Sequence, residues 1–73
     1  MKAVTFRELF EHGKQDQKLR IVTVNNRVFT GRYESRTDAM DNDPEVDTIE
    51  LELDSGRVVT FPESDIKTIE LID

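Results

Sequence analysis

The densest group of side chains that could do chemistry is a run of carboxylates in the middle of the chain. Its members are Asp38, Asp41, Asp43, Glu45 and Asp47. Crowded oxygen ligands suit Ca²⁺ or Mg²⁺, but an EF-hand loop that begins at Asp41 needs a glycine where Val46 stands. We therefore predict no metal site, and we interpret the run as a solvated loop or a loop that docks on a protein.

Nucleophilic or acid–base catalysis has little support in the sequence. His12 is the only histidine, and it stands beside Gly13, where a helix is expected to end. A cation is favourable near the carboxyl end of a helix, which explains His12 without catalysis. The chain also lacks cysteine and a glycine-rich phosphate loop. We predict no enzyme, no catalytic residue and no cofactor.

Four arginines are the candidates for a basic patch, namely Arg27, Arg32, Arg36 and Arg57. We expect these cations to pair with carboxylates on neighbouring strands, and those carboxylates are Glu34, Glu50 and Glu52. The 10 Lys and Arg are outnumbered by 16 Asp and Glu, which gives a formal net charge of −6. Such a balance repels nucleic acid.

A helix over residues 5–12 is predicted at the amino end of the chain. Thr5 and Glu8 have the spacing of a capping box, in which each side chain satisfies an amide near the helix start. The apolar face of this helix consists of Phe6, Leu9 and Phe10. Gly13 is expected to close the helix in a left-handed conformation.

The remainder of the chain reads as β-strands. They are expected at residues 18–24, 27–35, 47–54, 57–61 and 66–72. Asn25-Asn26 and Ser55-Gly56 are predicted turns, and residues 62–65 a tight corner. The predicted core residues of the later strands are Ile49, Leu51, Leu53, Val59, Ile69 and Leu71.

These elements predict a single domain over residues 1–73. Five short strands bury their apolar faces best as a small, strongly bent antiparallel barrel. Gly31 supplies the sharp bend that one strand needs, and the helix covers an open end. The fold class expected is therefore mainly β with a short amino-terminal α-helix.

At this level the chain resembles the Sm-like (LSm-type) small β-barrel proteins. The resemblance rests on the strand–turn–strand of residues 22–31, which ends at the bending Gly31, and on the closing strand that begins at Asp65. Family members bind uridine-rich RNA with an Asp followed by a Met-Asn pair. Residues 38–42 of this chain are similar to that motif. The resemblance also implies rings in which strand four pairs with strand five of the next subunit.

The corner before the last strand carries Pro62-Glu63-Ser64-Asp65, where the Sm-like family has Arg or Lys followed by Gly. The layout also resembles the acidic Rho-binding transcription inhibitors. That second resemblance implies an acidic barrel that occupies the basic, nucleic-acid-binding surface of a partner protein.

We therefore expect a non-enzymatic, cytoplasmic binding module that docks on a protein, with no nucleic-acid or membrane partner, as a monomer or weak dimer. The predicted docking residues are Asp38, Met40, Asp41, Asn42, Asp43, Glu63 and Asp65. The alternative is an Sm-like RNA-binding protein that acts as a ring. Its predicted RNA-binding residues are Arg32, Arg36 and Asn42. An acidic loop continuous with the corner would favour the first reading, and clustered arginines would favour the second.

Overall fold

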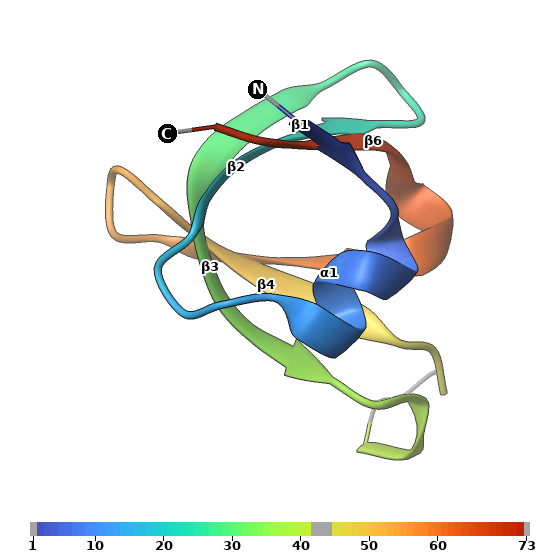
Figure 1. Ribbon diagram of the computed structural model, residues 1–73. Coiled ribbons are helices and arrows are strands. Elements are labelled where there is room, and N and C mark those ends of the chain that lie inside the picture. The colour runs from blue at the N-terminus through green and yellow to red at the C-terminus, as the bar shows by residue number, and fades with distance from the viewer. Residues whose placement is uncertain (1, 42–44, 73) are drawn as a thin grey trace.

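The structure is a computed structural model that describes residues 2–41 and 45–72 (Figure 1). The described residues form one α-helix, two 3₁₀ turns and one six-stranded sheet. The strands are β1 (Lys2–Val4), β2 (Lys18–Thr23), β3 (Val28–Thr37), β4 (Thr48–Leu53), β5 (Val58–Pro62) and β6 (Ile66–Leu71). The helical elements are α1 (Phe6–His12), η1 (Ala39–Asp41) and η2 (Glu63–Asp65). The mainly β fold with a short amino-terminal helix is confirmed.

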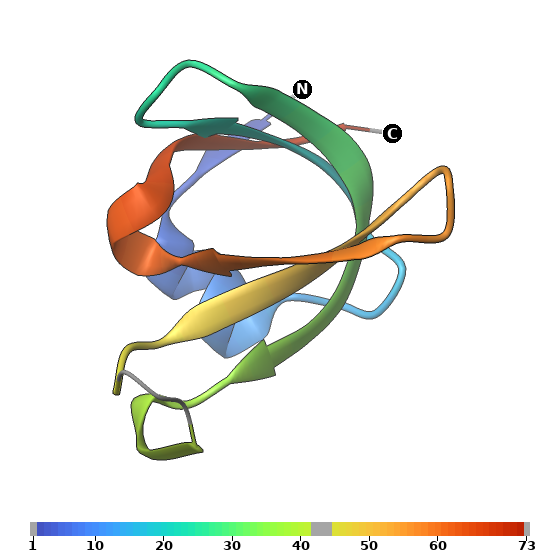
Figure 2. The same cartoon turned by 180° about the vertical axis from the view of Figure 1, so that it is seen from behind.

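The strands are arranged in the order β1-β6-β2-β3-β4-β5, and every neighbouring pair is antiparallel. The sheet curls around the core, as the two opposite views show (Figure 1, Figure 2). It is not closed by hydrogen bonds, since β1 and β5 remain its two edges. The expected barrel is therefore a strongly curled open sheet.

The structure has one strand more than the five predicted from the sequence, namely β1 at the amino end. It pairs with β6, with Lys2 opposite Leu71 and Val4 opposite Ile69. Three residues are too few to show an alternating pattern, so the segment carries no strand signal of its own. It forms a strand because its backbone pairs with the edge of β6.

Helix α1 begins with the predicted capping box. The Glu8 amide donates to Thr5 Oγ1 at 3.0 Å, and the Thr5 amide donates to Glu8 Oε1 at 3.1 Å. The prediction for Gly13 is wrong, because its φ is −61° and not left-handed. Its amide donates to the Leu9 carbonyl at 2.7 Å. Glycine is needed there for space, since a Cβ would crowd that carbonyl and the ring of Tyr33.

Both β-hairpins turn through three-residue loops, at residues 24–26 and 54–56. The last residue of each loop has a positive φ, 65° at Asn26 and 88° at Gly56. Asparagine and glycine are the residues that adopt this conformation at least cost. The turns therefore lie where they were predicted, but each loop is one residue longer than expected.

Strand β3 joins the two halves of the sheet, because its first half pairs with β2 and its second half with β4. Gly31 lies at the crossover, where a Cβ would overlap the carbonyl oxygen of Glu52. The register shifts between Tyr33 and Ser35, which is the signature of a bulge. The strand therefore bends where the sequence predicted, and it runs two residues further, to Thr37.

The core lies between the concave face of the sheet and α1. Of the predicted core residues, Ile49, Leu51 and Ile69 are fully buried. Leu53, Val59 and Leu71 are half-buried and pack against them. The remaining buried apolar residues are Phe6, Leu9, Phe10, Leu19, Ile21, Tyr33 and Phe61. The helix and the sheet therefore share one core.

Candidate functional site

The acidic loop and the acidic corner meet at one guanidinium group. Arg7 Nη2 lies 2.9 Å from Asp47 Oδ2 and 3.6 Å from Glu63 Oε1. The Glu63 amide also donates to the carbonyl oxygen of Asp47 at 3.2 Å. We call the described carboxylates of the loop and corner the acidic surface. They are Asp38, Asp41, Glu45, Asp47, Glu63 and Asp65.

Asp47 holds this surface together from the loop side. Its Oδ1 accepts a hydrogen bond from the Ala39 amide at 2.8 Å, at the start of η1. The hydrogen bonds from Arg7 and Ala39 stabilise the carboxylate and hold the pKa of Asp47 below its usual range. The same contact with Asp47 raises the pKa of Arg7. Asp47 therefore has a structural role, because its carboxylate joins Arg7 to the start of η1.

Apolar atoms lie among these charges. Met40 is 88% exposed and Val46 is 38% exposed. A hollow between the loop and the corner is lined by Ala39, Glu45, Val46, Asp47, Glu63 and Ser64. A surface that offers carboxylates around exposed apolar atoms suits long cationic side chains, which have an apolar stem and a charged head.

The predicted docking residues that the structure describes lie in two segments, the loop and the corner. Asp38, Met40 and Asp41 lie in and beside η1, while Glu63 and Asp65 belong to η2. Asn42 and Asp43 lie outside the described residues. Within residues 2–41 and 45–72, no group of three or more Asp, Glu, His or Cys side chains could hold a metal ion.

Asp65 faces a second hollow on the other side of the corner. Its carbonyl oxygen accepts the Val24 amide at 2.9 Å, which ties η2 to the β2–β3 hairpin. The floor of the hollow is an edge-to-face pair formed by Phe29 and Phe61, with ring centroids 5.1 Å apart. The lining residues are Thr23, Val24, Asn25, Arg27, Phe29, Thr60, Phe61 and Asp65.

Two of the candidate RNA-binding residues are engaged within the fold. Arg32 lies 3.6 Å from Glu52 on the neighbouring strand, as predicted. Arg36 has no such carboxylate partner among the described residues. It donates to the carbonyl oxygen of Phe10, and its guanidinium lies 5.0 Å from the centre of the Phe10 ring. Arg36 therefore attaches β3 to α1.

The other two arginines have different surroundings. Arg27 lies over the ring of Phe29, at 5.7 Å from its centre. Arg57 follows the β4–β5 turn, where its amide donates to Ser55 Oγ at 3.4 Å. Among the described residues, no carboxylate lies within ion-pair distance of Arg27 or Arg57. The expected pairing therefore holds for Arg32 and is not found for the other three.

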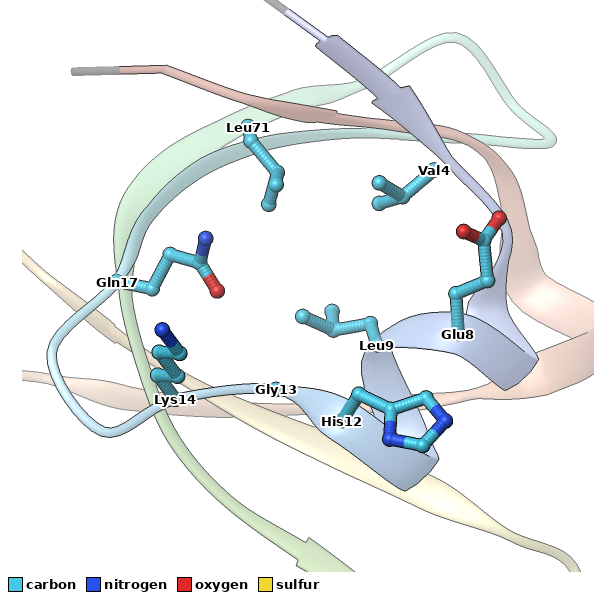
Figure 3. Close-up of a pocket in the computed structure, with 8 residues that line it drawn as sticks. All are labelled: Val4, Glu8, Leu9, His12, Gly13, Lys14, Gln17 and Leu71. Atoms are coloured by element: carbon cyan, nitrogen blue, oxygen red, sulfur yellow. The ribbon is translucent and has the colours of Figure 1, made fainter.

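A cavity of about 160 Å³ lies between α1, β1 and the end of β6 (Figure 3). Its lining residues are Val4, Glu8, Leu9, His12, Gly13, Lys14, Gln17 and Leu71. His12 stands in the last turn of α1, as predicted, at the rim of this cavity. The hydrogen bonds with Thr5 hold the pKa of Glu8 below its usual range, so Glu8 is a poor proton donor at neutral pH.

The central residue of the candidate site, Arg7, is absent from the sequence prediction. It is one charged residue on a short helix, 40 residues away from the Asp47 that it contacts. No local spacing reports such a contact. The one signal is indirect, since a helix that begins at Thr5 must dock on the sheet to be stable.

Comparison of the chain with protein-family models, with curated protein sequences and with solved structures gave no match. In the part of the chain that the structure describes, no helix combines the length and the hydropathy that a bilayer crossing needs.

Proposed function

We propose that this chain is a non-enzymatic binding module that docks on a basic surface of a protein partner. The docking site is the acidic surface, together with Met40 and Val46. The partner supplies Lys and Arg side chains whose charged heads meet the carboxylates and whose stems cover the apolar atoms.

One observation carries this proposal. The loop and the corner are joined through Arg7, which contacts Asp47 and Glu63 at 2.9 and 3.6 Å. The two acidic segments therefore lie side by side, although they are separated in the sequence. A single cation, itself engaged on both sides, does not neutralise the remaining carboxylates. This continuity is the feature that favours a protein partner over RNA.

The surroundings of the arginines support the same reading. RNA binding depends on cations that are free to meet phosphates. Arg32 is paired with Glu52, and Arg36 is held by the Phe10 carbonyl and ring. An Sm-like RNA-binding ring is the alternative, for which Arg27 and Arg57 are the candidate cations without a carboxylate at ion-pair distance among the described residues.

We further propose that the module belongs with the Sm-like small barrels, is cytoplasmic, and acts as a monomer or weak dimer. The bent β3, which passes from β2 to β4, supports the family assignment. The pairing of β1 with β6 supports the low oligomeric state. It occupies the edge of the last strand, which Sm-like rings use between subunits.

The proposal is tested by affinity capture from a cell extract with two charge-matched baits. One bait carries Glu45→Gln, Glu63→Gln and Asp65→Asn on the acidic surface. The control bait removes the same number of charges elsewhere, with Asp16→Asn, Glu34→Gln and Asp54→Asn. We expect the wild-type and control baits to retain the same proteins, and the acidic-surface variant to lose them. Equal capture by all three baits would refute the proposal.

A further inference from the structure

Within residues 2–41 and 45–72, strand β5 has a strand partner on one of its two sides only. It is the last strand in the order of the sheet and pairs with β4 alone (Figure 2). At the opposite end of the sheet, the three-residue β1 covers the end of β6. An open edge is a template for an added strand.

The register shows which backbone groups of β5 point outward. The Leu53 amide donates to the Arg57 carbonyl at 2.8 Å, so this closing pair is hydrogen-bonded. Hydrogen-bonded pairs alternate along an antiparallel ladder. Val59 and Phe61 therefore bond to β4, while Val58 and Thr60 direct their N–H and C=O groups away from it. No backbone hydrogen bond from another described segment reaches Val58 or Thr60.

The side chains along this edge are suited to contact. Val58 is 49% exposed and Thr60 is also exposed. Thr60 and Phe61 line the hollow whose floor is the Phe29–Phe61 pair. A strand added to β5 would thus run past an aromatic surface that accepts one apolar side chain. Pro62 lacks an N–H, which ends the useful edge at its carboxyl end.

The charges at the two ends of β5 give the added strand a direction. Arg57 precedes the strand, and Glu63 and Asp65 of the acidic surface follow it. An antiparallel partner enters at the acidic end and leaves at Arg57. Its first residues must then be basic, its middle residues β-branched or apolar, and its last residue acidic.

We propose that β5 binds an extended segment of a partner protein as an additional antiparallel strand, with a basic amino-terminal end on Glu63 and Asp65. This proposal rests on the proposed function, because it assigns the binding mode of a protein that the acidic surface recruits. The backbone of Val58 and Thr60 supplies the hydrogen bonds, and the carboxylates supply the direction.

A synthetic peptide tests the proposal in its simplest form. The sequence Lys-Arg-Thr-Val-Thr-Ile-Thr-Glu places its second residue opposite Glu63, its fifth opposite Thr60 and its last opposite Arg57. The control peptide, Thr-Glu-Thr-Val-Thr-Ile-Lys-Arg, has the same composition and the same residues at positions three to six, with the charges exchanged between its ends. By NMR titration against the full chain, we expect the first peptide to shift the amide signals of Val58 and Thr60, and the second to bind at least about tenfold more weakly. No shift up to about 1 mM of the first peptide would overturn the proposal.

A pair of variants isolates the backbone contact. Thr60→Pro removes the outward N–H, which β4 does not use, and Thr60→Val changes the side chain while keeping that N–H. We expect Thr60→Pro to weaken binding about tenfold, and Thr60→Val to change it by less than about twofold. The same loss in both variants would contradict strand addition.

The peptide offers an independent test that does not depend on how the proline variant folds. N-methylation of its fifth residue removes the N–H that points to Thr60, whereas N-methylation of its fourth residue alters an N–H that points away. We expect the first change to abolish binding and the second to spare it. Light scattering of the wild-type chain completes the test, because a dimer abolished by Thr60→Pro would assign the edge to a second copy and overturn the proposal.

The two proposals fail in different ways. If Glu63→Gln with Asp65→Asn leaves peptide affinity and its salt dependence unchanged while Thr60→Pro weakens binding, strand addition to β5 stands, but the basic end assigned to Glu63 and Asp65 is wrong and the acidic docking fails. If the charge variants abolish capture of partners while Thr60→Pro has no effect on peptide binding, docking through the acidic surface is supported and strand addition to β5 is wrong.

Discussion

Gly31 on β3 lies directly against the backbone of Glu52 on β4, so closely that a Cβ at position 31 would overlap the Glu52 carbonyl oxygen. The two strands approach in this way because β3 must leave β2 and continue along β4 at the same point. The bend of the sheet thus depends on the absence of one side chain.

Gly31→Ala is therefore expected to destabilise the chain, by about 1–3 kcal/mol, because the added methyl group forces two backbones apart. Urea denaturation followed by circular dichroism measures the loss. Thr30→Ala, at an exposed position of the same strand, is the control and should change the free energy of unfolding much less. A stabilised Gly31→Ala variant would show that the close contact is not required.

Two leucines on β4 make a matched pair for the core. Leu51 is fully buried, whereas Leu53 is half-buried at the margin of the core. Leu51→Ala should cost about 2–5 kcal/mol, a large part of the stability of so small a domain. Leu53→Ala should cost clearly less, because its site can fill with water. Equal losses in thermal or chemical denaturation would contradict the assigned burial.

The sequence predicts the elements with strong local signals and misses those that depend on distant contacts. The capping box at Thr5 and the alternation of β4 are local patterns that form as expected, and the hairpin turns form in the predicted places with loops one residue longer. Strand β1 and the role of Arg7 depend on partners at the other end of the chain or 40 residues away. The prediction of a left-handed conformation at Gly13 is wrong, because glycine is required there by close packing against Leu9 and Tyr33 and not by a turn.

The acidic surface should show its internal link in a pH titration. The pKa of Asp47 is lowered in the folded chain by the hydrogen bonds from Arg7 and Ala39. Its contribution to stability is therefore present above the ordinary aspartate pKa of about 3.9, and it is lost as the pH falls through the lower folded pKa. NMR titration of the side-chain carboxyl measures this value directly.

Arg7→Met tests the cause of that shift. Without the guanidinium, the pKa of Asp47 should rise towards its ordinary value, and the stability lost at acid pH should shrink. Arg20→Met is the matched control, because Arg20 pairs with Glu70 at 3.7 Å on a different part of the sheet. An Asp47 pKa that is unaffected by Arg7→Met would show that the loop and the corner are not joined by this contact.

RNA should bind weakly or not at all. With a net charge of −6, we expect no dissociation constant below about 10⁻⁴ M for single-stranded RNA at physiological salt. Fluorescence anisotropy with uridine-rich and adenine-rich oligomers measures it. A micromolar constant that weakens steeply with salt would support the RNA-binding alternative, and Arg32, Arg36 and Asn42 would then be the first residues to change.

A monomer or weak dimer is expected in solution. Subunits that each carry a net charge of −6 repel one another, and β1 occupies part of the edge of β6. Light scattering at physiological salt checks this expectation. Lys2→Pro, which removes an N–H that points to Leu71 on β6, tests whether that strand limits association. A stable hexamer or heptamer of the wild-type chain would contradict the expectation.

The pairing of β1 with β6 also sets the order in which the chain can fold. On the ribosome, β1 emerges well before β6, yet residues 2–4 find their partners only at residues 69–71. Strand β2 likewise waits for β6 as one of its two neighbours. The nascent chain can form its local hairpins early, but the sheet is completed only when the last strand has left the exit tunnel. Because two of the five strand pairings join distant parts of the chain, folding is expected on the scale of about milliseconds to seconds, with the amino-terminal strand among the last elements to settle.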